Sequence, residues 1–247
     1  MFDKQFEEIR AVSSEMGCFS WTTREYQDDI LNFIIENRDR GCGIIEVGCY
    51  KGGLSALLAF VCKEFGWPFY TIDVDPTAID STTKLLKRLK LDQIATIHLG
   101  NLSSFVSATT LSERPTLIIL DGDHRYEAVV RDIQDTFKLN QLSHAAVFHD
   151  FTLRHPTSGE KVDQAVRDCF GSDCPVRPIG AKMLGDGKYP TKEKPSEDGH
   201  WWEVPGSEGA IVELMPSQLT RVASIENPIP RTSLAHRIKN YFMKPSA

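Results

Sequence analysis

The amino-acid sequence predicts an α/β fold in which helices cover both faces of a mostly parallel sheet. Short apolar runs of strand length alternate with longer stretches in which apolar residues recur at helical spacing. The runs are apolar nearly throughout, which is typical of strands that are buried on both faces. Polar residues follow these runs where each predicted strand ends, at the edge of such a sheet where ligands bind.

The predicted helices and strands follow one another from residue 4 onward. After a first helix over residues 4–14, Thr22 and Glu25 fit a capping box for a second helix, which ends near Gly41. Later helices are predicted over 54–65, 77–89, a stretch from 102, 127–139 and 162–170. Strands are predicted over 44–47, 68–73, 94–99, 116–120, 145–148, 174–179 and 209–215.

The length of 247 residues suits one large domain with an extension. We assign residues 1–220 to this domain and residues 221–247 to a C-terminal extension with a short basic helix. Residues 182–207 form an insertion rich in Gly, Pro, Lys and Glu, which is too long for a simple turn. It is either a lid, an oligomer contact or a surface loop. Trp201 and Trp202 within it could stack on a ligand.

Composition narrows the classes of partner. The net charge of −6 argues against nucleic acid and anionic membranes as partners. No apolar run approaches the roughly 18 residues of a membrane span, and the N-terminus carries no signal-peptide core. Six cysteines without a CxxC pair indicate reduced thiols. We therefore expect a cytoplasmic protein, and the helix and extension at its two ends are compatible with a homodimer.

A glycine turn follows the first predicted strand. Glu46 ends the apolar run, and Gly48, Gly52 and Gly53 allow a sharp turn that a ligand can approach closely. The helix that follows would direct free N–H groups at such a ligand. The spacing is not the GxGxxG of dinucleotide-binding folds, and no phosphate-binding P-loop occurs.

Three segments occur in register: Glu46-Val-Gly48-Cys-Tyr-Lys-Gly52-Gly53, then Asp73 after the second strand, then Asp121-Gly-Asp-His124-Arg-Tyr126-Glu-Ala-Val. Together they resemble class I S-adenosylmethionine-dependent methyltransferases over about residues 20–170. The closest branch is related to the catechol-type and macrolide-sugar O-methyltransferases. This resemblance implies a Rossmann-like sheet of seven strands, of which the last is antiparallel.

The resemblance also implies a cofactor site for S-adenosylmethionine. Its methionine and ribose region would be lined by Gly48, Tyr50 and Gly52, with Glu46 near the amino group. Asp73 would accept both ribose hydroxyls. Asn101 would lie near the adenine edge, where Leu102 could cover the ring. Asp121 would also belong to the cofactor-binding residues. The remaining acid of the second strand end, Asp75, fits a turn-capping role instead.

Methyl transfer requires a group that removes or neutralises the proton of the acceptor. In the catechol-type relatives a divalent ion does this, and Asp121 and Asp150 match two of its ligand positions, with His149 beside them. Asp123 and His124 add to this group, which could hold Mg²⁺ or a softer ion. Here Phe151 follows Asp150, where the relatives have a further ligand. Without a metal, His124 or His149, together with Asp150, would carry the catalysis.

The acceptor is expected to be a small hydroxylated molecule: a sugar, a phenol or a natural-product intermediate. Two alternatives remain open on the sequence. One is a non-catalytic domain of the same fold that binds a nucleotide-like ligand. The other is a nicotinamide-dependent oxidoreductase, which the glycine spacing disfavours.

Overall fold

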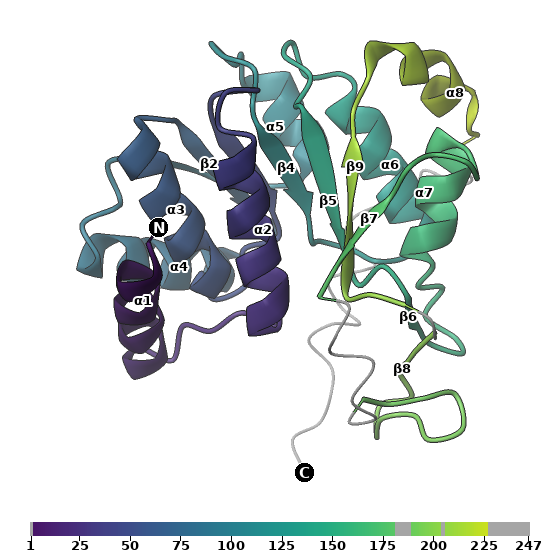
Figure 1. Cartoon of the computed structure of the whole chain (residues 1–247), viewed down its shortest axis with the longest axis horizontal. Coiled ribbons are helices and arrows are strands. Elements are labelled where there is room, and N and C mark those ends of the chain that lie inside the picture. Colours follow the sequence, from purple (N-terminus) through teal and green to yellow (C-terminus); the bar gives the residue numbers. More distant parts are fainter. Residues whose placement is uncertain (1, 181–188, 204–205, 227–247) are drawn as a thin grey trace.

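The structure is a computed structural model that describes residues 2–180, 189–203 and 206–226. A seven-stranded sheet with the strand order β3-β2-β1-β4-β5-β9-β7 forms its centre (Figure 1). β9 runs antiparallel to both of its neighbours, whereas β1 to β5 are parallel. The fold class predicted from the sequence is confirmed. The strands are Ile44–Val47 (β1), Phe69–Asp73 (β2), Ala95–Leu99 (β3), Leu117–Leu120 (β4), Ala145–His149 (β5), Arg177–Ile179 (β7) and Gly209–Glu213 (β9).

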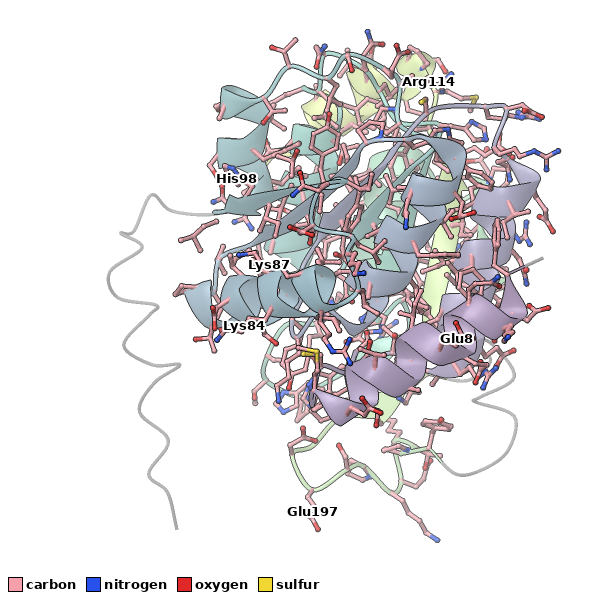
Figure 2. All side chains as sticks on the ribbon, turned by 90° about the vertical axis from the view of Figure 1, so that its left-hand side faces the viewer. Glu8, Lys84, Lys87, His98, Arg114 and Glu197 are labelled. Atoms are coloured by element: carbon pink, nitrogen blue, oxygen red, sulfur yellow. The ribbon has the colours of Figure 1, made fainter. Side chains whose placement is uncertain are left out.

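Helices cover both faces of the sheet and enclose two apolar cores. One face carries α1 (Asp3–Glu15), α2 (Arg24–Glu36), α3 (Gly53–Phe65) and α4 (Pro76–Arg88), and the other carries α5 (Leu102–Ala108), α6 (Tyr126–Thr136), α7 (Val162–Phe170) and α8 (Leu219–Ser224). Alternate strand residues serve the two cores, as Ile44 and Ile45 do in β1. Figure 2 shows the molecule from the side of the helices α1 to α4, with Glu8 of α1 and Lys84 of α4 at the surface.

Two further strands lie outside the main sheet. β6 (Leu153–Arg154) pairs antiparallel with β8 (Trp201–Trp202), below the sheet in Figure 1. Arg154 ties this pair to the domain through Asp163 of α7, at 2.7 Å, and it also contacts Glu203, which follows β8, at 3.2 Å. The predicted insertion therefore contains a strand that the sequence did not reveal. Whether it acts as a lid stays a prediction.

Several element ends differ from the sequence predictions, and two of these differences affect the packing of the domain. The N-cap of α2 is Thr23, one residue after the predicted Thr22, and its side chain accepts a hydrogen bond from Tyr26 N. The predicted boundary at residue 220 falls inside α8, where Val222 is buried against the second core. Gln134 of α6 also donates to the carbonyls of Val222 and Ile225. The predicted basic helix near residues 234–242 lies outside the described residues.

Two expectations from composition can be compared with the structure. All six cysteines are free thiols. Among the helices of the described segments, none is both long enough and apolar enough to span a membrane.

Candidate active site

The carboxyl ends of the parallel strands meet at one edge of the sheet, which faces β6 and β8 in Figure 1. Because β9 is antiparallel, its first residue lies at this same edge, where Gly209 pairs with His149. The loops after β1, β2, β4 and β5 and the loop before β9 therefore converge here. The site is built from these five connections.

The glycines of the turn after β1 are required by neighbouring protein atoms. Gly48 has a φ of +92°, and a Cβ on it would lie 1.9 Å from the carbonyl oxygen of Asp121. Gly52 has a φ of +85°, and a Cβ there would lie 2.9 Å from Thr82 Cα. Both conformations favour glycine. The turn thus packs tightly between the loop after β4 and helix α4, which brings the predicted cofactor turn beside Asp121.

Asp73 organises the same turn from the end of β2. Its Oδ2 accepts hydrogen bonds from the backbone N–H groups of Cys49, at 2.9 Å, and Tyr50, at 3.1 Å. Its Oδ1 accepts from Asp75 N at 2.9 Å. A carboxylate has about four acceptor positions, so a ribose hydroxyl can still bind. Asp75 caps α4 through Thr77 N, as the sequence predicts.

Glu46 lies behind the turn, with 1% of its surface exposed. Its Oε2 accepts hydrogen bonds from Ser55 Oγ, at 2.6 Å, and Thr71 Oγ1, at 2.7 Å. Burial raises the pKa of Glu46 to about 8, although both hydroxyls oppose that shift. The structure thus gives Glu46 a supporting position under the turn, in place of the direct contact with the cofactor that the sequence predicts.

The predicted adenine region differs in a similar way. Asn101 is the N-cap of α5, and its Oδ1 accepts from Ser104 N at 2.9 Å. Leu102 is fully buried in the second core, so the prediction that it covers a ring is wrong. Tyr50, by contrast, is 38% exposed beside the turn. A ligand at the turn can reach Tyr50, whereas it cannot reach Leu102.

Two histidines and two aspartates form a compact cluster across the edge from the turn. His149 Nδ1 lies 2.7 Å from Asp121 Oδ1, and His124 Nε2 lies 3.3 Å from the same oxygen. His124 Nδ1 lies 3.0 Å from Asp150 Oδ2. The side chains are 5 to 20% exposed, and His149 is the most buried of the four. The structure therefore brings together Asp121, His124, His149 and Asp150, which are four of the five residues that the sequence assigned to catalysis or metal binding.

These short contacts are not all hydrogen bonds. Within the part of the chain that the structure describes, His124 Nε2 and His149 Nδ1 have no partner with hydrogen-bond geometry. One ligand atom from each of Asp121, His124 and His149 lies within 4.8 Å of the others. Buried polar atoms without partners are costly, and they suggest an unseen ion or water. The donor set therefore fits a divalent cation.

Each ionisable group of the cluster is shifted by the others. Burial alone would lower the pKa of His124, but Asp150 and Asp121 raise it to about 10. Burial alone would raise the pKa of Asp150, but His149 and His124 lower it to about 2. The pKa of His149 is raised in the same way as that of His124, by Asp121 and Asp150. The cluster thus balances carboxylate charge with positive charge in a buried space.

Three residues at this site were not predicted: Glu208, Thr23 and Tyr26. Glu208 is 2% exposed, and its Oε1 lies 3.5 Å from His149 Nε2. The same carboxylate accepts hydrogen bonds from the backbone N–H and the hydroxyl of Thr23. Tyr26 packs its ring edge-on against His149 at 5.0 Å. For Glu208, the only signal in the sequence was an acid immediately before an apolar strand. Glu208 lies at the site because that strand, β9, is antiparallel to its neighbours.

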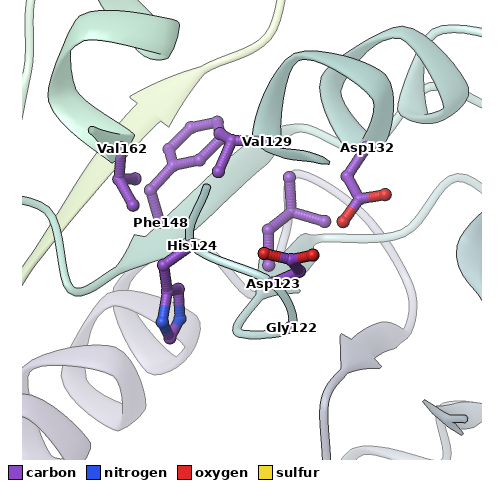
Figure 3. A pocket seen from close by; sticks show the side chains of 8 residues that line it. Gly122, Asp123, His124, Val129, Asp132, Phe148 and Val162 are labelled. Carbon is purple, nitrogen blue, oxygen red and sulfur yellow. The ribbon is translucent and has the colours of Figure 1, made fainter. Parts of the chain in front are cut away.

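Asp123 is separate from the cluster, contrary to the sequence prediction. Its carboxylate binds the guanidinium of Arg125, with Arg125 Nε at 2.8 Å. Figure 3 shows the imidazole of His124 directed away from the carboxylates of Asp123 and Asp132. A small hollow lies between them under α6, where burial raises the pKa of Asp132 to about 7. The two acids of the 121–124 loop therefore have different partners: Asp121 lies with the histidines, and Asp123 binds Arg125.

Exposed aromatic side chains lie beside the turn. Phe19 and Trp21 are 44% and 74% exposed, and both rings contact that of Tyr50, at 5.6 and 6.1 Å. The segment that carries them continues to Thr23, which is anchored on Glu208. It therefore runs along the edge from the turn to the histidine cluster. Trp201 and Trp202, which the sequence singled out, are half-buried in β8.

Comparisons with known proteins match part of this chain to a protein family. A family model described as a methyltransferase domain matches residues 45–151, which include the turn, Asp73 and the histidine cluster. Among curated proteins, none matches the sequence.

Solved structures share the fold. One is the O-methyltransferase TomG from Streptomyces achromogenes, involved in tomaymycin synthesis and solved with SAM: 14% identity, TM-score 0.56, covering 85% of this chain and 89% of that chain. Another is the O-methyltransferase from Bacillus cereus in complex with SAH: 14% identity, TM-score 0.55, covering 85% and 91%. At these identities the likeness establishes the architecture.

Proposed function

We propose that the protein, of which residues 45–151 match a methyltransferase-domain family, transfers the methyl group of S-adenosylmethionine to a hydroxyl oxygen of a small molecule. The observation that carries this proposal is the contact between the glycine turn and the cluster, since Gly48 packs directly on Asp121. A cofactor held by the turn would present its methyl group toward His124 and Asp150. The two similar structures are O-methyltransferases solved with SAM or SAH, which supports the same assignment.

The cofactor is held by groups that do not themselves react. Asp73 shapes the turn through the N–H groups of Cys49 and Tyr50 and would accept hydrogen bonds from the ribose. Tyr50 offers an exposed ring beside it. An acidic edge suits a cationic sulfonium better than it suits phosphates.

The acceptor hydroxyl must lose its proton as it attacks. His124 has 20% of its side chain exposed, whereas His149 has 5%, so a bound acceptor can reach His124 and not His149. His149 would orient Asp121 from behind. A divalent cation held by this cluster, whether Mg²⁺ or another ion, would supply charge that lowers the pKa of a bound hydroxyl.

The side chains around the site support a proposal for the class of methyl acceptor. The exposed rings of Phe19, Trp21 and Tyr50 suit stacking on a flat ring or on the apolar face of a sugar. The net charge of −6 remains unfavourable for a nucleic-acid acceptor. We therefore retain a sugar, a phenol or a natural-product intermediate. The family match supports neither an oxidoreductase nor a non-catalytic domain.

Calorimetry with S-adenosylhomocysteine tests the cofactor assignment. We expect saturable binding to the full chain, weakened at least tenfold in Asp73→Ala and in the more conservative Asp73→Asn. The physical reason is that each variant removes the charged acceptor that holds the turn. Asp80→Ala is the matched control, because Asp80 lies on the exposed side of α4, paired with Lys84. Absence of binding at millimolar ligand would contradict the proposal.

A further inference from the structure

We propose that Asp121, His124 and His149 form a three-ligand site that selects a nitrogen-preferring transition ion, of the Zn²⁺ type, over Mg²⁺. This inference rests on the proposed function, since it concerns the same edge of the domain. It differs from the ligand set predicted from the sequence, Asp121, Asp150 and His149, by placing His124 at the ion and Asp150 behind it.

The first argument is where the ring nitrogens point. His149 Nδ1 and His124 Nε2 both lie next to Asp121 Oδ1, at 2.7 and 3.3 Å. Among the described residues neither nitrogen has a hydrogen-bond partner, although His149 is 4% exposed. Ligands that bind Zn²⁺ at about 2.0–2.1 Å with tetrahedral angles lie roughly 3.3 Å apart. His124 Nε2 lies at this distance from Asp121 Oδ1, whereas His149 Nδ1 lies closer to it. One ligand atom from each of the three residues lies within 4.8 Å of the others, so a single ion can be placed among them.

The second argument is what lies behind each histidine. His124 Nδ1, the nitrogen away from Asp121, lies 3.0 Å from Asp150 Oδ2. His149 Nε2, also the nitrogen away from Asp121, lies 3.5 Å from both Asp150 Oδ1 and Glu208 Oε1. Metal-binding histidines commonly donate their second nitrogen to a carboxylate, which fixes the ring orientation and the tautomer. His124 shows this arrangement in its 3.0 Å distance to Asp150. His149 Nε2 lies near two carboxylates but has no partner with hydrogen-bond geometry among the described residues.

The third argument is the chemistry of the donors. Mg²⁺ prefers an octahedral shell of oxygen ligands and usually keeps several waters. Two imidazoles with one carboxylate suit Zn²⁺, Fe²⁺, Co²⁺ or Ni²⁺ better. Glu208 extends the arrangement to the N-terminus of α2, because its carboxylate also binds Thr23. The ion would thus be coupled to the segment that carries Phe19 and Trp21.

The experiment measures ion binding to the chelator-treated full chain, without turnover. We expect Zn²⁺ to bind in calorimetry at least 100-fold more tightly than Mg²⁺. His124→Asn and His149→Asn should each weaken Zn²⁺ binding at least 100-fold, and Asp150→Asn about tenfold. His98→Asn is the matched control, since His98 lies on β3 and binds Ser104 instead. Co²⁺ absorption bands in the unmodified protein give a readout that does not depend on any variant folding.

Three results would overturn the inference: Mg²⁺ binding as tight as Zn²⁺ binding, Zn²⁺ binding that survives both histidine variants, or no ion binding at millimolar concentration. Titration of the same preparation with S-adenosylhomocysteine separates this inference from the proposed function. If that ligand binds and no ion does, only the ion assignment fails. If Zn²⁺ binds and that ligand does not, the proposed function fails and the ion site stands.

Discussion

At the scale of single residues, the acids of the site divide into those that face a ligand and those that support the backbone. Asp73 does both, because its carboxylate holds two N–H groups of the turn and stays partly exposed. Glu46 only supports, since it is buried with Ser55 and Thr71. The chemical type of a residue was thus predictable, but its burial was not.

Glu46 makes stability depend on pH. Its pKa is about 8 when folded, against an ordinary value of 4.5 for a glutamate side chain. The unfolded chain therefore binds fewer protons at this residue between these values, so the contribution of Glu46 to stability falls as pH rises from about 5 to 8 and then levels off. Glu46→Gln should remove part of this fall, which at about 1.4 kcal/mol per pKa unit amounts to a few kcal/mol. Urea unfolding at several pH values measures it.

The control for this measurement is Glu64→Gln, a substitution on the exposed side of α3. It should leave the pH slope of the wild type unchanged. Asp132, whose pKa is also raised, adds to the slope in every variant, so the comparison isolates Glu46. Equal slopes in Glu46→Gln and the wild type would show that Glu46 is ionised when folded.

At the scale of elements, the start of α2 connects the N-terminal helices to the site. Thr23 caps α2 through Tyr26 N and also binds Glu208, the acid beside His149. The sequence pattern placed this cap at Thr22, because Glu25 stands three residues later. Glu208 overrides the pattern, since the bond it accepts from Thr23 holds that residue in the capping position.

Removing the Thr23 hydroxyl should therefore cost more than removing that of Thr22. We expect Thr23→Val to lower the free energy of unfolding by about 1–2 kcal/mol, since a cap and a partner of a buried carboxylate are lost. Thr22→Val removes only side-chain contacts with Ser20 and Gln27 and should cost clearly less. Urea unfolding of both variants decides the point, and a larger loss in Thr22→Val would contradict the structural assignment.

At the scale of the whole molecule, the strands differ in how far neighbouring strands and helices cover their backbone amides. β1, β4 and β5 have strand neighbours on both sides and helices on both faces. β3 is an edge strand, and β6 and β8 are two residues each. Glu197 marks how far the loop before β8 projects from the body in Figure 2.

Hydrogen exchange followed by mass spectrometry should reflect this difference. We expect the slowest exchange in β1, β4 and β5, because their amides open only when the whole domain unfolds. The β6–β8 pair should exchange fastest among the strands, since local opening breaks few bonds. Protection of β6 and β8 equal to that of β4 would show that this pair is instead part of the central cooperative unit.

The sequence by itself determined the order of strands and helices along the chain and the edge at which polar residues gather. These depend on local periodicity and on residues that end strands or directly follow them, such as Asp73, Asp121 and His149. Only the tertiary structure decided which of these residues face a ligand. Burial and partners come from distant segments: β9 brings Glu208 to His149, α4 requires Gly52, and Ser55 with Thr71 encloses Glu46. Such contacts join residues up to 185 positions apart, and no local pattern encodes them.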